Sequence, residues 1–518
     1  MKKGLLLCLT YLAMASLSLK ATTKEFQLDY RYQLSNSSLT ESGSTLLSLM
    51  DGESATSHQD IEKTILVARI SDTFKQSLEQ FSHSCEGEVP ELPIMLPLNR
   101  AHIWPVPVPA VDCNGTNASI ADELLVKIAG LSAELETARV HDEKIAEALD
   151  FLRKLATNMK NFRGFGNQNR LESAMPVSAA IGFGSSLNIA TGGAQDYAYV
   201  KKTIDDGYVP TADSFDAKGF MSEFDLSINF SCDQLLCINP SYKYDAQKKK
   251  LYVQLAMNTN ITSENFTRKP LNLALVLDIS GSMSATDNTE KTRLDWAKEA
   301  AIKTLNSLQS DDYVSVVVFD NEAEVLMPAR QIKSNQDKEE IIKAINNLQT
   351  RGSTNLYDGL KKGYELVSDN GVKLASYNHR VILISDAGLN TGTTDEASNV
   401  RLVSDYAAES IGLSAIGLGL NFNQDFIMGI TESLGGNYLF AQSGVDMYRY
   451  FESFDFLVTP IAQHLKARLS FKNTKAQLVK AYGISSQAAI ENDDLINVKS
   501  LFLSNEGGGA MLLEYLLD

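Results

Sequence analysis

The clearest pattern along the chain is an apolar run that ends at an acidic residue. Residues 271–277 are apolar except for Asn272, and Asp278 follows them directly. Strands that are buried on both faces, as in a parallel sheet, have this pattern. Open α/β sheets bind their ligands where such strands end. The sequence therefore predicts a buried strand with a functional position at its carboxyl end.

Strand and helix patterns alternate over residues 270–460. The predicted strands cover residues 271–278, 313–320, 323–327, 380–386 and 411–418. Helical periodicity covers residues 293–308, 337–348, 356–367, 396–409, 426–434 and 447–458. This alternation predicts an α/β domain built on a doubly wound, mostly parallel sheet.

The segments on both sides of this domain have the two-residue period of half-buried strands. Residues 224–228 and 251–257 show it before the domain, and residues 465–471, 477–482 and 495–503 show it afterwards. We expect the two flanks to form one antiparallel β-sandwich, with the α/β domain inserted between them.

A helical pattern dominates the residues before these flanks. Residues 59–81 have helical periodicity, and apolar residues recur over 119–159 in alternating steps of four and three. Such steps form an a/d heptad seam, which Asp142 interrupts, and Ser119 with Asp122 gives a capping signal at its start. We expect one long helix packed on the chain's own earlier helix. Self-association through this 119–159 heptad helix, as an intermolecular coiled coil, is the alternative.

The amino terminus resembles a secretory signal, because Lys2 and Lys3 precede an apolar stretch with small residues near Ala21. No later segment has the length of a transmembrane helix. The expected organisation is a signal peptide (1–21), a mainly helical region of unknown role (22–170), a β-rich flank (171–269), the α/β domain (270–460) and a β-rich flank (461–518). We therefore expect the protein to be secreted, periplasmic or at the cell surface.

Charge and cysteine content narrow the classes of function. The formal net charge of −17 argues against a nucleic-acid partner, which needs clustered Lys and Arg. Four cysteines follow the signal, and an even number in an exported protein suggests disulfides. We favour Cys85–Cys113 and Cys232–Cys237, because the members of each pair are close in sequence. A zinc site is the alternative interpretation.

Three segments should meet at the carboxyl edge of the predicted sheet. They are Asp278-x-Ser280-x-Ser282, the turn around Thr354 before a helix, and the strand end that carries Asp386. Together they supply two carboxylates and three hydroxyls, which are the hard oxygen ligands that Mg²⁺ prefers. Neutral hydroxyls leave the ion electrophilic, so a carboxylate of a partner could complete its shell.

These residues resemble the metal-ion-dependent adhesion site of von Willebrand factor type A domains. The resemblance covers roughly residues 270–460 and implies that Asp278, Ser280, Ser282, Thr354 and Asp386 hold the metal, either directly or through water. Mg²⁺ is the expected metal, with Mn²⁺ or Ca²⁺ possible. Ala387 stands where many members have glycine. In related domains the last helix, here residues 447–458, moves when the metal shell changes.

The flanks resemble bacterial secreted type A-domain proteins, which are related to inter-alpha-trypsin inhibitor heavy chains and calcium-activated chloride channel regulators. The segments that carry this resemblance are 191–196, 482–483 and 507–510. The regulators have an H-E-x-x-H zinc protease motif, which this chain lacks, and phosphate-binding loops and the G-x-S-x-G elbow are also absent. Phosphotransferases that use a strand-end aspartate need a second carboxylate two positions later, where this chain has Ser280.

The sequence therefore predicts a protein that is not an enzyme and that binds an acidic side chain of a partner protein through the metal. Residues 283–290, 389–396 and 421–425 surround the site and would give specificity. One alternative is a structural or envelope-assembly component whose metal only stabilises the fold. A second alternative is a channel-regulator-like or enzymatic role in the amino-terminal half.

Overall fold

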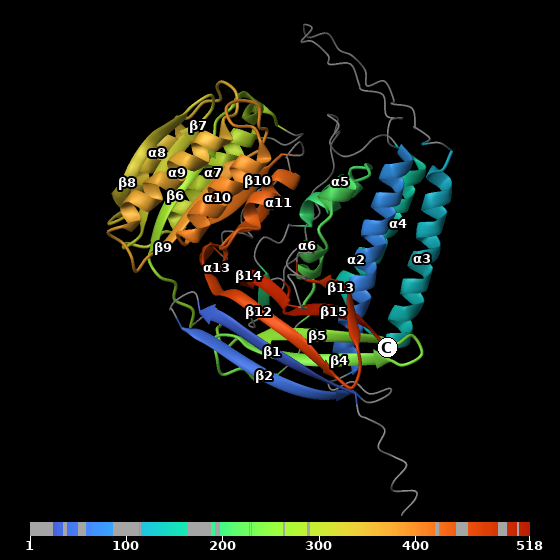
Figure 1. The fold of residues 1–518 in the computed structure, drawn as a ribbon. Coiled ribbons are helices and arrows are strands. Elements are labelled where there is room, and N and C mark those ends of the chain that lie inside the picture. Colours follow the sequence, from blue (N-terminus) through green and yellow to red (C-terminus); the bar gives the residue numbers. More distant parts are fainter. Residues whose placement is uncertain are drawn as a thin grey trace, which may run out of the picture.

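A computed structural model of the chain has three parts: an α/β domain, a β-sandwich and a helical bundle (Figure 1). The structure describes residues 24–34, 39–49, 58–85, 113, 115–162, 188–191, 197–226, 228, 230–262, 265–286, 291–419, 424–441, 454–484, 495–504 and 507–518. The predicted signal peptide lies outside these residues. None of the described helices is both long enough and apolar enough to cross a membrane.

The α/β domain is built on a six-stranded sheet with the order β11-β10-β9-β6-β7-β8. The strands are β6 (Leu271–Asp278), β7 (Tyr313–Phe319), β8 (Ala323–Gln331), β9 (Asn378–Ser385), β10 (Ile411–Leu418) and β11 (Asn437–Ala441). All neighbouring pairs are parallel except β7 and β8. Because the chain runs from β6 to β7 on one side and returns to β9 on the other, the order of strands reverses between β6 and β9. This switch point is where open α/β sheets form ligand crevices.

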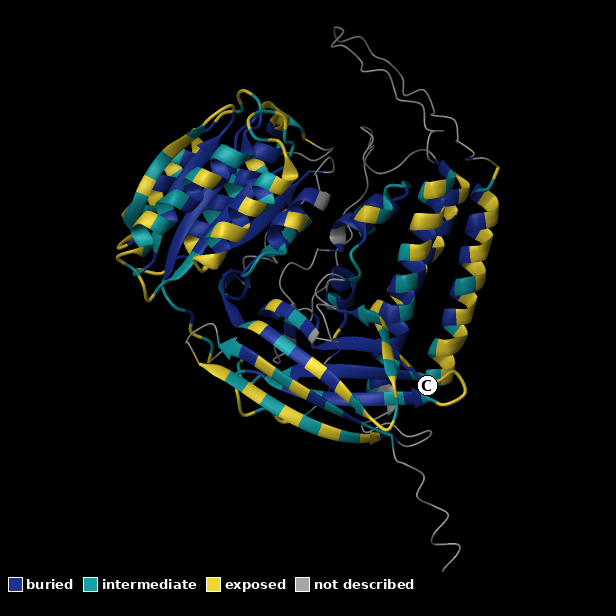
Figure 2. Cartoon of the chain, viewed as in Figure 1, coloured by how far each residue is buried: buried dark blue, intermediate teal, exposed yellow. Residues whose placement is uncertain are grey.

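Helices cover both faces of this sheet, as the doubly wound prediction requires. The helices are α7 (Arg293–Ser307), α8 (Asn335–Asn346), α9 (Leu356–Gly371), α10 (Glu396–Ala408), α11 (Gln424–Thr431) and α13 (Phe454–Val458). One face of β6 packs on α7, α8 and α13, and the other packs on α9 and its neighbours. The strands are therefore buried on both faces, whereas the helices expose their outer sides (Figure 2). A Cβ at Gly363 of α9 would lie 2.5 Å from Val276, so glycine permits the close approach of helix and sheet.

Periodicity located most elements of this domain to within a few residues. The bounds of β6 and β10 are the predicted ones, and the predicted α/β fold class is confirmed. Strand β11 was not predicted. It has only five residues and lies at the edge of the sheet, so its hydrophobic pattern is short. Of the predicted helix 447–458, only residues 454–458 lie within the described part, as α13.

The β-sandwich consists of two antiparallel sheets, with the orders β2-β1-β12-β14-β3 and β13-β15-β5-β4. Its strands are β1 (Lys24–Leu34), β2 (Thr40–Leu49), β3 (Asn188–Thr191), β4 (Cys237–Asp245), β5 (Lys250–Asn258), β12 (Pro460–Lys472), β13 (Ala476–Tyr482), β14 (Leu495–Ser504) and β15 (Ala510–Leu517). One apolar core joins side chains from both sheets. The α/β domain leaves this sandwich after β5 and returns at β12, so the predicted insertion is confirmed.

Two features of the regions outside the α/β domain were not predicted correctly in detail. The region that was expected to be mainly helical also contains strands β1 and β2 before its helices, and β1 pairs with β12 at the far end of the chain. Their burial depends on that distant strand, which local periodicity does not reveal. Of residues 224–228, which were predicted as a strand, the described ones (224–226 and 228) belong to no strand; Asp225 makes an isolated bridge to Gly508.

The helical bundle contains α2 (His58–Cys85), α3 (Asn117–Ala138) and α4 (Glu143–Lys160). The periodicity predicted α2 correctly but joined α3 and α4 into one helix. The chain turns between them, with Arg139 in a left-handed conformation and the Asp142 carboxylate accepting a hydrogen bond from the Ile145 amide as the cap of α4. The apolar seam is buried within one chain, against α2 and between α3 and α4, which fits the predicted intramolecular packing.

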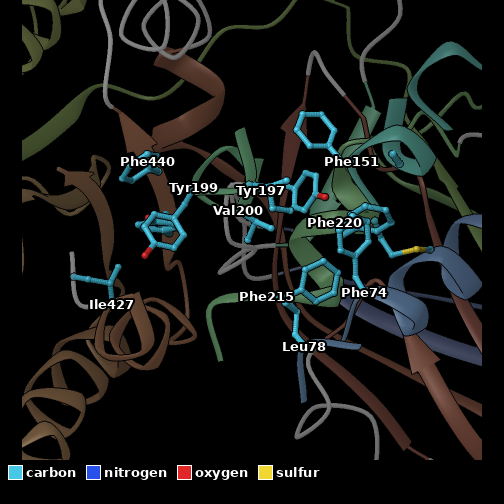
Figure 3. Close-up of a cluster of buried hydrophobic side chains, with 14 of the residues drawn as sticks. Phe74, Leu78, Phe151, Tyr197, Tyr199, Val200, Phe215, Phe220, Ile427 and Phe440 are labelled. Atoms are coloured by element: carbon cyan, nitrogen blue, oxygen red, sulfur yellow. The ribbon is translucent and has the colours of Figure 1, made fainter. Parts of the chain in front are cut away.

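The bundle and the α/β domain share one continuous apolar core through the short helix α5 (Ala198–Asp205). Tyr199 of α5 packs edge-on against Phe440 of β11, with ring centroids 5.5 Å apart. Tyr197, just before α5, lies within an aromatic cluster with Phe74 and Phe220 (Figure 3). The region predicted as β-rich thus also contains α5 and α6 (Ala217–Ser222), which connect the parts of the molecule.

Both predicted disulfides are present. Cys85–Cys113 ties the end of α2 to the start of α3, and Cys232–Cys237 ties the start of β4 to the segment before it. All four cysteines are therefore paired, which excludes the zinc alternative for them.

Candidate functional site

The site begins with Asp278, the last residue of β6. All eight residues of β6 are buried, so the carboxylate of Asp278 lies at the end of a fully buried strand whose other residues, apart from Asn272, are apolar. The amide of Ser280 donates a 2.9 Å hydrogen bond to its Oδ1, and the hydroxyl of Ser385 donates a 2.5 Å bond to its Oδ2. These two bonds fix the carboxylate between the ends of β6 and β9.

Two serine hydroxyls follow Asp278: Ser280 directly precedes a short 3₁₀ turn, Gly281–Ser284, and Ser282 lies within it. The Oγ atoms of Ser280 and Ser282 lie 3.1 Å apart. Ser280 is buried, whereas Ser282 is exposed. The pair therefore extends from the interior of the site to the surface of the molecule.

Thr354 lies in the turn before α9, and two loops hold its backbone. The Gly281 amide donates a 3.1 Å hydrogen bond to the carbonyl of Gly352, which joins this turn to the serine turn. The Thr354 amide donates to the side chain of Asn390 at 2.6 Å, and its carbonyl accepts from the amides of Asn390 and Thr391. Its hydroxyl oxygen is buried and has no hydrogen-bond partner among the described residues.

Asp386 follows β9 directly and is buried beside an arginine. Nη1 of Arg293 lies 2.8 Å from its Oδ2, and both side chains are almost fully buried. The amide of Gly388 donates a 3.3 Å bond to Oδ1. Ala387 has φ 55°, in the left-handed region, which explains why a glycine suits this position in related chains.

The two carboxylates influence each other electrostatically. Burial, followed by repulsion from the charge of Asp386, raises the pKa of Asp278 to about 7, although hydrogen bonds from Ser385 and Ser280 oppose this shift. An aspartate with such a pKa is only partly ionised at neutral pH without a cation nearby. A divalent cation at this position would favour the ionised form of Asp278.

The structure thus brings all three predicted segments together at the switch point of the sheet. The donor set fits a hard divalent cation, because it offers two buried carboxylates, a pair of adjacent hydroxyls and a buried threonine hydroxyl without a partner. Within the described part of the chain, no group of three or more His, Cys, Asp and Glu side chains could hold a metal.

Three residues around the site were not assigned roles from the sequence. Ser385 holds Asp278, Arg293 pairs with Asp386, and Asn390 holds Thr354. Ser385 is the last residue of β9 and Asn390 lies in the loop that follows Asp386, so their proximity could have been inferred. Arg293 gave no signal, because it is the first residue of an ordinary capped helix. Of the loops expected to give specificity, 389–396 is described, but residues 287–290 and 421–423 lie outside the described part.

Comparison with known proteins supports the resemblance of this domain. Residues 273–389 match the von Willebrand factor type A domain family. An uncharacterised protein of Synechocystis sp. is 30% identical over 177 residues, which is 34% of this chain and 39% of that protein. Protein YfbK of Escherichia coli is 24% identical over 297 residues, or 55% of this chain and 49% of that one. Inter-alpha-trypsin inhibitor heavy chain H1 of Sus scrofa is 26% identical over 199 residues, or 37% of this chain and 21% of that one.

The match therefore spans less than half of each of these relatives. Among solved structures, a von Willebrand factor type A protein from Catenulispora acidiphila aligns with a TM-score of 0.38 and 12% identity, over 56% of this chain and 67% of that one. BatB from Bacteroides thetaiotaomicron aligns with a TM-score of 0.30 and 17% identity, over 36% and 97%.

Proposed function

The chain contains a von Willebrand factor type A domain, from which we propose that it binds a partner protein through a divalent metal held at the end of β6. The presence of a type A domain supports a role of this chain in protein–protein interaction. The more specific proposal is that the domain captures an acidic side chain of the partner. The observation that carries it is the buried hydroxyl of Thr354, which has no partner among the described residues although two buried carboxylates belong to the same site.

The roles of the residues follow from their surroundings. Ser280 and Ser282 would ligate the metal through their hydroxyls, and Thr354 and Asp278 and Asp386 would act directly or through water. Ser385 keeps one oxygen of Asp278 engaged, so the carboxylate cannot rotate freely. Asn390 holds the backbone of Thr354 and thereby its hydroxyl.

A bound Mg²⁺ would supply an electrophilic position that an incoming carboxylate oxygen can occupy. Exposure of Ser282, in contrast to the other four proposed ligands, leaves that side of the site open to a partner. None of the hydroxyls of Ser280, Ser282 and Thr354 has a hydrogen bond to a basic side chain among the described residues, so we propose a binding function and no enzymatic reaction. The two disulfides agree with a protein that is secreted or located in the cell envelope.

Metal binding is the first test. We expect Mn²⁺, followed by electron paramagnetic resonance, to bind the purified chain in a one-to-one ratio, and Asp278→Ala to abolish this binding. Asp395→Asn is the matched control, since Asp395 is an exposed aspartate that caps α10 in the neighbouring loop. Equal Mn²⁺ binding by wild type and Asp278→Ala would contradict the proposed site.

Partner capture is the second test, and it separates adhesion from a metal that only stabilises the fold. The immobilised chain is exposed to native extracts with Mg²⁺ or with EDTA, and Asp278→Ala is treated in parallel. We expect partners that are retained only by the wild type with Mg²⁺. Identical partner lists in all samples, together with a melting temperature that falls on chelation, would support the structural alternative.

A further inference from the structure

The outer face of the sandwich sheet that contains β1 and β12 carries an unusual pair of charges. Charged residues face each other at three places across these two antiparallel strands. Two of the pairs join opposite charges: Glu25 with Lys472, and Asp29 with Arg468. The third joins two positive charges, because Arg31 faces Lys466. Directly opposed side chains in a sheet have Cβ atoms about 4.5–5.5 Å apart, and like charges at this spacing destabilise the sheet.

No acidic side chain of the protein compensates this like-charge pair. Within the described part of the chain, neither Arg31 nor Lys466 forms an ion pair or a side-chain hydrogen bond. Arg31 is exposed and Lys466 is partly exposed, on a face of the sheet where exposed and buried residues alternate (Figure 2). The whole chain has a net charge of −17, so this positive pair contrasts with the rest of the molecule. An anion bound between the two side chains would remove their repulsion.

A hollow of about 300 Å³ lies at this pair. The described residues that line it are Arg31, Tyr32, Gln33, Thr40, His464 and Lys466, and none of them is acidic. The hydroxyl of Tyr32 donates a 2.5 Å hydrogen bond to Glu41, which is not among the lining residues. The volume is at the lower end of the range of ligand pockets, so it suits a small polar group.

A β-bulge brings a third nitrogen donor to the hollow. Just after the pair of Arg31 and Lys466, two residues of β12, His464 and Leu465, stand opposite the single Tyr32 of β1. His464 has φ 51°, in the left-handed region that is unfavourable for a side chain with a Cβ. Leu465 is buried in the core of the sandwich, whereas His464 is exposed and lines the hollow. Bulges of this kind redirect a side chain, and they are frequent beside functional sites.

We propose that this hollow binds a phosphate group, either free or carried by a lipid headgroup. A phosphate monoester has a charge of about −1.5 to −2 at pH 7, which matches the charges of Arg31 and Lys466. The guanidinium can donate two parallel hydrogen bonds to phosphate oxygens, and the ammonium adds a point charge. The imidazole of His464 supplies a further N–H donor. The site belongs to the sandwich, so the proposal does not depend on the metal site.

Binding of inorganic phosphate to the full chain is the first test, followed by the phosphorus NMR line width in a phosphate-free buffer. We expect Arg31→Gln and Lys466→Gln each to weaken binding at least about fivefold, because each removes one charge beside the hollow. Lys472→Gln is the matched control, since Lys472 faces Glu25 and lies about 20 Å along β12 from Lys466, beyond the Debye length of about 8 Å. Equal binding by wild type, Arg31→Gln and Lys466→Gln would overturn the inference.

Charge reversal distinguishes a binding site from a structural role. Lys466→Glu makes the pair with Arg31 one of opposite charges, so we expect its melting temperature in phosphate-free buffer to exceed that of the wild type. The same variant should no longer bind phosphate. Added phosphate should therefore raise the melting temperature of the wild type and leave that of Lys466→Glu unchanged. A lower melting temperature of Lys466→Glu without phosphate would show that Lys466 stabilises the sheet by itself, which would overturn the inference.

Sedimentation with lipid vesicles distinguishes the two sources of the phosphate group. Phosphatidylcholine vesicles are doped with phosphatidic acid, a monoester, or with phosphatidylglycerol, a diester. Retention by phosphatidic acid that Arg31→Gln abolishes would assign a lipid headgroup, and binding of inorganic phosphate without retention would assign a free phosphate group. Equal retention by both lipids, reduced as much by Lys472→Gln as by Arg31→Gln, would show only general attraction to a negative surface. That result, or a wild type that binds neither inorganic phosphate nor phosphatidic acid, would overturn the inference.

Discussion

The two ends of strand β6 both carry buried carboxylates, but they differ in how far these carboxylates are satisfied. At the amino end, Asp312 forms a two-bond ion pair with Arg268, with distances of 2.8 and 2.6 Å, and also accepts bonds from the amides of Leu271 and Gln309. At the carboxyl end, Asp278 and Asp386 lie near a threonine hydroxyl that has no partner in the described part of the chain. Burial of charge alone therefore does not identify a functional site.

The two ends differ in how many hydrogen bonds the protein itself supplies to the buried oxygen atoms. The oxygens of Asp312 accept four hydrogen bonds from Arg268, Leu271 and Gln309, so this carboxylate has little capacity left to bind a ligand. The carboxyl end keeps donor oxygens without full protein partners, which is energetically unfavourable unless a ligand uses them. We therefore interpret the amino end as structural and the carboxyl end as functional.

Removing Arg268 should have the largest effect on stability. Arg268→Met leaves Asp312 charged and buried without its cation, and loss of one partner of a buried pair costs about 3–5 kcal/mol of the free energy of unfolding. Urea denaturation measures this cost, with the exposed Arg401→Met as the control. Mn²⁺ affinity should not change; a large loss of Mn²⁺ affinity in folded Arg268→Met would contradict the division between the two ends.

Added metal should stabilise the protein only by binding at the carboxyl end of strand β6. A ligand at about 100 times its Kd adds about 2.7 kcal/mol to the free energy of unfolding, if it binds only the folded chain. We therefore expect Mg²⁺ to raise the melting temperature of the wild type and EDTA to reverse the increase. Asp278→Asn should show no increase. Stabilisation that persists in Asp278→Asn would place the metal elsewhere.

In the metal-free protein, the pH dependence of the free energy of unfolding should report the protonation of Asp278. Its pKa in the folded state is about 7, above the ordinary value of 3.8 for an aspartate, so between these pH values the folded chain holds a proton that the unfolded chain has lost. This contribution to stability is fully present below about pH 3.8, and rising pH removes it at up to about 1.4 kcal/mol per unit until about pH 7.

Comparison of denaturation curves for wild type and Asp278→Asn, with EDTA present, isolates this contribution. The difference in free energy of unfolding between the two proteins should change between pH 4 and pH 7 and then stay constant. A difference that is the same at every pH would show that Asp278 keeps an ordinary pKa.

Substitution of Ala387 should have the smallest effect on stability, because it changes only the backbone strain between Asp386 and Gly388. Its φ of 55° is unfavourable for alanine and free of strain for glycine. Ala387→Gly should stabilise the chain by about 1 kcal/mol, less the entropy that glycine adds to the unfolded state. Thermal denaturation measures the change, with Gly388→Ala expected to act in the opposite direction or not at all. Loss of stability in Ala387→Gly would mean that the methyl group of the buried alanine packs better than its backbone is strained.

Local pattern was sufficient for much of the fold. The apolar run before Asp278 and the helical period after Thr292 identify β6 and α7 correctly, because burial of a parallel strand and of one helix face leaves a direct pattern. The same reasoning wrongly predicted one helix in place of α3 and α4, because the heptad pattern continues across Asp142 although the chain reverses its direction there. It also missed β1, whose partner β12 lies over 400 residues away in sequence, and β2, which pairs with β1 at the edge of the same sheet.

The sequence by itself determined the donor set of the proposed site. Asp278, Ser280 and Ser282 follow a buried strand, and Thr354 and Asp386 stand at the matching turn and strand end, so the topology of a doubly wound sheet brings them to one edge. Only the tertiary structure decided which charges surround them. It placed Arg293 against Asp386 and Arg268 against Asp312, and it left the hydroxyl of Thr354 buried without a partner among the described residues. The physical reason is that the position of each strand follows from local periodicity, whereas ion pairs between distant segments depend on how the helices pack over the sheet.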